Sequence, residues 1–88
     1  MSQPDERVKW ACRRGMLELD LFLVPFFEHQ YANLTDTEKQ TFQQLLEESD
    51  PVLLHYLMGH AQADNSPARE MVEKIRGFRI TRSQHSFF

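Results

Sequence analysis

The sequence predicts an all-α fold, a small bundle of about five short helices. Several stretches place apolar residues three and four positions apart, and no stretch shows the period of two that is typical of half-buried strands. Capping residues and prolines recur at short intervals, which predicts short helices with short connections. The 88 residues suffice for one small domain, which we assign to residues 1–80, with residues 81–88 expected to form a disordered tail.

The first predicted helix opens at Gln3-Pro4-Asp5-Glu6 and ends at Gly15. Proline suits a first helical turn, and carboxylates are favoured at its positive end. Apolar residues at helical spacing form one stripe: Val8, Ala11 and Cys12. Off that stripe lie a tryptophan and four cations: Trp10, Arg7, Lys9, Arg13 and Arg14.

The second predicted helix covers about residues 16–31 and is apolar nearly all round, so we expect it to be the buried central element. One predicted face carries Leu17, Leu21 and Val24, and the other carries Leu19, Phe22 and Phe26. Pro25 lies inside this helix. Because proline removes a backbone hydrogen bond and clashes with the preceding turn, we expect a kink or break near residues 21–24.

Three further helices follow from local signals. Thr35 and Glu38 form a capping box that opens the third helix, and its inward residues are Phe42, Leu45 and Leu46. Asp50 is predicted to cap the fourth helix, with Pro51 at its first position, and Gly59 is predicted to end it. The fifth helix is predicted to begin at Ser66-Pro67, after a polar loop, and to carry Met71, Val72, Ile75 and Phe78.

Composition narrows the function classes. The formal net charge is -3, whereas nucleic-acid binding usually requires a strongly basic face. One cysteine precludes an intramolecular disulfide and is typical of a reducing compartment. The polar, acidic first residues do not resemble a secretory signal, and the longest apolar run, residues 21–27, is too short to span a bilayer. We therefore expect a cytoplasmic protein without membrane insertion.

The residues that enzymes use for chemistry are scattered or missing. The four histidines are far apart in the sequence, and the spacing of His55 and His60 does not put two metal ligands on one helical face. Cys12 has no second cysteine with which to build a zinc site, and its place on an apolar stripe favours a half-buried thiol over a nucleophile. No glycine-rich phosphate loop occurs. We expect no catalytic residues, no metal site and no stably bound cofactor.

Charge of both signs gathers between the first two helices. Arg13 and Arg14 follow the first helix, Gly15 allows a sharp turn, and Glu18 falls in the first turn of the next helix. The basic first helix could contact nucleic acid, but Glu18 and Asp20 would be repelled, whereas a protein surface can complement both signs. Docking onto a protein and a simple surface pair between Arg14 and Glu18 remain equally open on these grounds.

At this turn the chain resembles a known family. Arg14-Gly15-Met16-Leu17-Glu18 matches the R-G-x-x-E motif of the succinate dehydrogenase assembly factors, the bacterial SdhE proteins (formerly YgfY, once labelled the antitoxin CptB) and their mitochondrial counterparts. Flanking blocks resemble the bacterial branch in the same order: Trp10-Ala11-Cys12-Arg13, Pro25-Phe26-Phe27-Glu28-His29, Leu34-Thr35-Asp36-Thr37-Glu38 and Asp50-Pro51.

The resemblance implies a monomeric, non-enzymatic assembly factor that binds the flavoprotein subunit of succinate dehydrogenase, and in some bacteria that of fumarate reductase. It would promote covalent attachment of FAD to a histidine of that subunit. The positions that match the R-G-x-x-E motif imply three partner-binding residues: Arg14, Gly15 and Glu18. Arg7, Trp10, Arg13 and Asp20 are added because they lie near the motif. The alternative is a regulatory protein-binding module, such as the antitoxin of a toxin–antitoxin pair.

Overall fold

Residues 4–86 of the computed structural model form five α-helices and one turn of 3-10 helix, without a strand; side chains are described for residues 5–78. In chain order the elements are α1 (Pro4–Ala11), α2 (Leu17–Gln30), η1 (Tyr31–Asn33), α3 (Asp36–Leu45), α4 (Asp50–Leu57) and α5 (Ser66–Ser86). The prediction of a small all-α bundle is confirmed. Among these residues no helix combines the length and the apolar character needed to cross a membrane.

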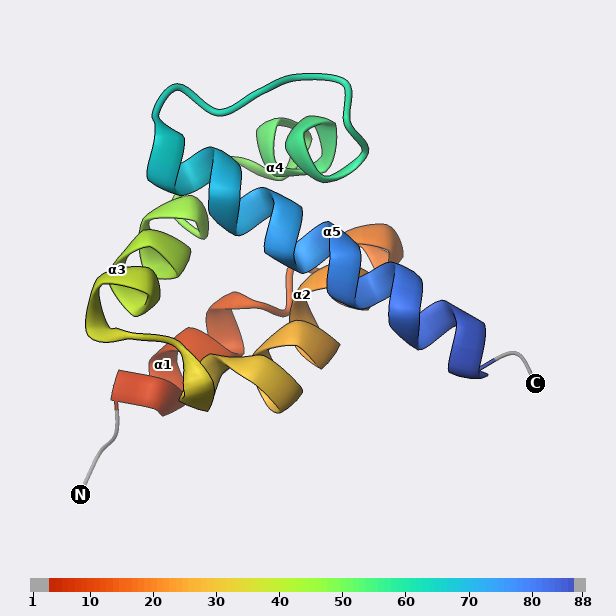
Figure 1. The fold of residues 1–88 in the computed structure, drawn as a ribbon, viewed down its shortest axis with the longest axis horizontal. Coiled ribbons are helices and arrows are strands. Elements are labelled where there is room, and N and C mark those ends of the chain that lie inside the picture. The colour runs from red at the N-terminus through yellow and green to blue at the C-terminus, as the bar shows by residue number, and fades with distance from the viewer. Residues whose placement is uncertain (1–3, 87–88) are drawn as a thin grey trace.

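The longest helix, α5, organises the packing. It contacts α2, α3 and α4, and α2 also contacts α4. Figure 1 shows α5 running diagonally through the view, with α4 on one side of it, α1 on the other, and α2 crossing behind it. The large side chains with almost no exposed surface come from every helix except α1: Leu19, Leu23, Phe42, Leu53, Leu57, Met71 and Ile75. Because each short helix buries only one face against this shared core, none is expected to be stable alone.

The second helix was predicted to be the buried central element, but α2 is buried on one face only. Its buried side chains follow one helical face, Leu19, Phe22, Leu23 and Phe26, whereas Leu17 is 72% exposed and Leu21 is 45% exposed. At 100° per residue these two leucines point away from the core. The helix also continues through Pro25, so the predicted break does not occur, whereas a kink stays a prediction. Buried residues before and after the proline hold both halves of α2 against the core.

Two predicted helix ends differ from the structure. The first helix stops at Ala11 instead of Gly15, so residues 12–16 form an irregular connection. Asp50 does not cap α4, since Ser49 occupies the cap position without a side-chain bond and Asp50 is already helical. The carboxylate of Asp50 binds Arg14 instead. A contact with a distant residue has thus taken the place of a local cap.

Other local signals are confirmed. The Thr35 hydroxyl accepts a hydrogen bond from the Glu38 amide (3.1 Å), and the Glu38 carboxylate accepts one from the Thr35 amide (2.9 Å). Gly59 follows α4 with a φ of +83°. The fifth helix begins at Ser66 as predicted and extends to Ser86, beyond the expected domain end at residue 80. Residues 87–88 lie outside the described residues, and disorder of the tail stays a prediction.

Candidate functional site

The connection between α1 and α2 is the candidate site, and residues 12–18 are called the corner below. Gly15 turns the chain there with a φ of +79°, a backbone conformation that side chains rarely adopt. A Cβ built on Gly15 would meet no atom within 4 Å, so the glycine faces open space. The Arg14 amide donates a hydrogen bond to the Asp20 carboxylate (2.8 Å), which ties the turn to α2.

The Arg14 side chain points inward from the corner. Its Nε donates to Oδ1 of Asp50 (2.8 Å), and Nη1 donates to the carbonyls of Leu46 (2.8 Å) and Ala11 (3.2 Å). Nη2 donates to the carbonyl of Glu48 (2.7 Å). Carbonyls beyond a helix end lack intrahelical partners and carry partial negative charge, so a guanidinium satisfies them well. Arg14 therefore joins the end of α1 to the connection between α3 and α4.

The other predicted partner-binding residues divide into two groups. Asp20 is half-buried and accepts the hydrogen bond from Arg14, so its carboxylate already has a function within the fold. The remaining residues lie on the surface: Arg7, Trp10, Arg13, Gly15 and Glu18. Trp10 is 66% exposed, which is unusual for so large an apolar ring. Among the described residues no ion pair joins Glu18 to Arg14, so the simple pairing of these two charges is wrong.

Sequence reasoning missed Leu17 and Leu21 as surface residues. They are one helical turn apart and lie beside Glu18 on the exposed side of the first turns of α2. The available signal was the surplus of apolar residues in α2, which exceeds what one buried face can absorb. Together with Gly15 these residues form an exposed strip of apolar and acidic character.

Cys12 does not belong to the exposed surface. Its side chain is 1% exposed, and burial raises the pKa of the thiol to about 12, partly offset by the nearby Arg14. Because the thiolate is the nucleophilic form, this cysteine stays unreactive at neutral pH. A half-buried thiol was predicted, and the structure buries it almost completely.

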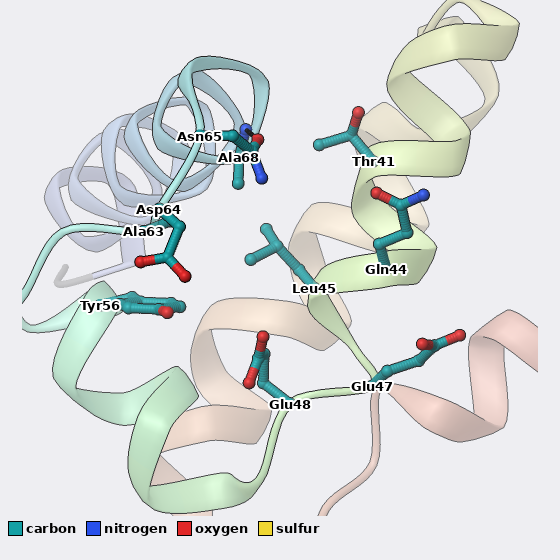
Figure 2. A pocket seen from close by; sticks show the side chains of 10 residues that line it. All are labelled: Thr41, Gln44, Leu45, Glu47, Glu48, Tyr56, Ala63, Asp64, Asn65 and Ala68. Carbon is teal, nitrogen blue, oxygen red and sulfur yellow. Dashed lines mark hydrogen bonds between the residues drawn. The ribbon is translucent and has the colours of Figure 1, made fainter.

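A separate pocket of about 370 Å³ lies between α3, α4 and the start of α5. Figure 2 shows the carboxylates of Glu48 and Asp64 near the Tyr56 ring, and Glu47 at the rim. Partial burial, together with the charges of Glu48 and Asp64, raises the pKa of Tyr56. A pocket with this lining is unfavourable for phosphate groups and other anions.

No group of three or more histidine, cysteine or acidic side chains in the described part of the chain is arranged to hold a metal ion. His55 and His60 lie closer than their spacing suggested, with ring centroids 6.0 Å apart. The turn at Gly59 brings the two rings together, because His60 lies beyond the end of α4.

Comparison with known proteins identifies the family. A sequence model described as "Flavinator of succinate dehydrogenase" matches residues 6–79, which include the whole corner. The chain belongs to this family. The earlier resemblance, drawn from the R-G-x-x-E motif and its flanking blocks, is confirmed.

Several curated relatives support membership of the flavinator family. A protein named "FAD assembly factor SdhE" from Aliivibrio fischeri is 54% identical over 69 residues, covering 78% of this chain and 80% of the relative. Proteins of the same name from Vibrio cholerae and Coxiella burnetii are 51% identical over 69 residues and 41% identical over 78 residues. The former match covers 78% of this chain and 80% of the relative, the latter 86% and 95%.

A solved structure agrees with this membership. The solution structure of a protein called "UPF0350 protein" is 42% identical and superposes with a TM-score of 0.74, covering 96% of this chain and 92% of the other. The flavinator family therefore accounts for both the sequence and the helical arrangement of the chain.

Proposed function

We propose that this chain is a non-enzymatic assembly factor that binds the flavoprotein subunit of succinate dehydrogenase and promotes covalent attachment of FAD to it. The observation that carries the proposal is the match of residues 6–79 to the flavinator family, which spans nearly the whole folded domain. The flavoprotein subunit that the chain acts on is called the client below. In this proposal the flavoprotein subunit of fumarate reductase is a second client. The chain acts as a monomer in the cytoplasm.

The proposed docking surface is the exposed side of the corner. Gly15 lets a partner approach the backbone closely, because no Cβ occupies the open space there. Glu18 is exposed and offers a carboxylate beside Leu17 and Leu21. Apolar contacts supply binding free energy and charges supply orientation, so this strip has both components of an interface.

The first helix contributes the second part of the surface. Trp10, Arg7 and Arg13 are exposed on or just after α1, and tryptophan and arginine are enriched among residues that dominate binding. Arg14 and Asp20 were also predicted to bind the partner, but both make hydrogen bonds within the chain, so neither side chain is counted in the proposed docking surface.

The chain contributes positioning, whereas the flavin and the client histidine supply the covalent chemistry. Holding reacting groups in a productive orientation can lower a barrier by as much as about 7–11 kcal/mol. Stable FAD binding by this chain is not part of the proposal. The acidic lining of the 370 Å³ pocket supports this view, since Glu48 and Asp64 would repel the pyrophosphate of FAD.

Covalent flavin in the client tests the proposal. The gene is deleted, cell proteins are separated on a denaturing gel, and flavin fluorescence is measured at the succinate dehydrogenase flavoprotein. Fluorescence is expected to fall on deletion and to return with wild type but not with Glu18→Ala. Glu28→Ala is the matched control, because Glu28 is an exposed carboxylate on the same helix away from the corner. Undiminished fluorescence in the deletion strain would refute the proposal and favour a regulatory module.

A further inference from the structure

Arg14 is the first letter of the R-G-x-x-E motif, yet its guanidinium points away from the proposed docking surface. We infer that Arg14 is a positioning residue: it fixes the shape of the corner by binding Asp50 and the connection between α3 and α4, and it does not contact the client. This inference rests on the proposed docking function. It adds Asp50, which lies 36 positions away in the sequence, to the residues on which client binding depends.

The hydrogen-bond geometry supports an internal role. A guanidinium has five N–H groups, and Arg14 donates hydrogen bonds to four acceptors within the chain. The side chain is only 14% exposed, and its ion pair with Asp50 is 2.8 Å long. A client carboxylate could bind Arg14 only by displacing these partners, which would leave the part-buried carbonyls of Ala11 and Leu46 and the Asp50 carboxylate without these donors.

The partners of Arg14 explain how it controls the corner. The Ala11 carbonyl is the last of α1, whereas the Leu46 and Glu48 carbonyls belong to the connection that follows α3. The Arg14 amide meanwhile binds Asp20 on α2. Together with the ion pair to Asp50, these contacts tie the corner to four segments: the end of α1, the connection that follows α3, α4 and α2. The direction in which Gly15 and Glu18 face therefore depends on Arg14.

A lysine at position 14 could not make the same set of hydrogen bonds. Its ammonium group is a single centre, whereas the guanidinium presents donors on three nitrogens that reach separate acceptors. Asp50 is suited to its part because it sits in the first turn of α4, where a carboxylate is also favoured by the helix dipole. The ion pair thus holds α4 and the corner in one fixed relation.

A spectroscopic experiment tests positioning directly. In two-dimensional amide NMR spectra of the full chain, Asp50→Ala is expected to shift the signals of Gly15 and Glu18. The matched control is Asp36→Ala, because Asp36 is the first residue of α3 and is exposed without a described ion pair. Unchanged corner signals in Asp50→Ala would overturn the inference.

Client binding supplies a second, functional test. Affinity for the purified flavoprotein subunit is measured for Arg14→Ala, Asp50→Ala and the double variant, at a temperature where circular dichroism shows all of them folded. Each single substitution is expected to weaken binding about tenfold, and the double variant to be no weaker than Arg14→Ala alone, because coupled residues are not additive. Arg14→Lys and Asp50→Asn replace any variant that fails to fold.

The same series separates the inference from the proposed function. Wild type and Glu18→Ala are measured in parallel with the Asp50 variants. If wild type does not bind the subunit, the docking proposal itself fails. If Glu18→Ala weakens binding while Asp50→Ala binds like wild type, docking stands and Arg14 contacts the client directly, which overturns the inference.

Discussion

Gly15 offers a test that separates a structural turn from a docking contact. Its φ of +79° disfavours any residue with a Cβ, at a cost of about 1–2 kcal/mol. A Cβ at this position would meet no atom within 4 Å, so no steric clash adds to this backbone cost. Each kcal/mol lowers the Tm of a domain of this size by about 4–8 °C, so Gly15→Arg is expected to fold with a Tm lower by ~4–16 °C.

Flavinylation of the client is expected to respond far more strongly than stability. Gly15→Arg places a long cation on the proposed docking surface, so flavin fluorescence at the client should fall to the level of the deletion strain. Gly15→Ala has nearly the same backbone cost as Gly15→Arg but adds only a methyl group to the surface. It should therefore retain more client flavinylation than Gly15→Arg does. Gly15→Asn is a third variant, because asparagine tolerates the left-handed conformation and should recover part of the Tm.

Gly59 provides the matched control for backbone strain. Its φ is +83°, and an added Cβ would lie 3.1 Å from Nη2 of Arg76, so Gly59→Ala should destabilise the fold at least as much as Gly15→Ala. Gly59 follows α4 and lies outside the corner, so flavinylation should persist. The reasoning is refuted if Gly15→Arg fails to fold, or if Gly59→Ala abolishes flavinylation as completely as Gly15→Arg does.

Three further outcomes follow from single residues. Thr35→Ala breaks the capping box and should lower the free energy of unfolding, measured by urea titration, by about 1 kcal/mol. An unchanged urea midpoint would contradict this prediction. Leu17→Gln should change stability by less than about 0.5 kcal/mol yet weaken client binding, because Leu17 is 72% exposed. The Cys12 thiol should resist a thiol reagent at pH 8 until urea unfolds the chain. The pKa of this thiol is about 12 in the folded chain and 9.0 ordinarily. Because the unfolded chain then loses the proton first, the free energy of unfolding should fall as pH rises from 9 to 12.

Signals confined to a few neighbouring residues could be predicted from the sequence. The capping box of Thr35 and Glu38 needs only one turn of helix, and the turn at Gly59 needs only one residue with a positive φ. The inward faces of α3 and α5 were also predicted correctly, because their apolar residues occupy one side only. In each case the deciding interactions lie within a few positions along the chain.

The errors arose where distant segments meet. Asp50 was predicted as a helix cap because local propensity favours aspartate there, but the ion pair with Arg14 uses the same carboxylate. The burial of α2 was overestimated because periodicity cannot tell an apolar face that packs in the core from an apolar face that stays at the surface. Leu17 and Leu21 fit both descriptions in the sequence, and only the packing of α5 and α4 against the other face of α2 decides between them.

The R-G-x-x-E motif illustrates how residues close together in the sequence can have different physical roles. Arg14 is 14% exposed and satisfies carbonyls from two helix ends, whereas Gly15 and Glu18 face outward. Glycine removes bulk, the carboxylate supplies charge, and the arginine holds both in place from behind. A surface built this way is rigid before the client arrives, so less conformational entropy is lost on binding. Rigidity of the corner matters for a factor whose proposed contribution is the orientation of another protein, because orientation is lost if the surface that imposes it can move.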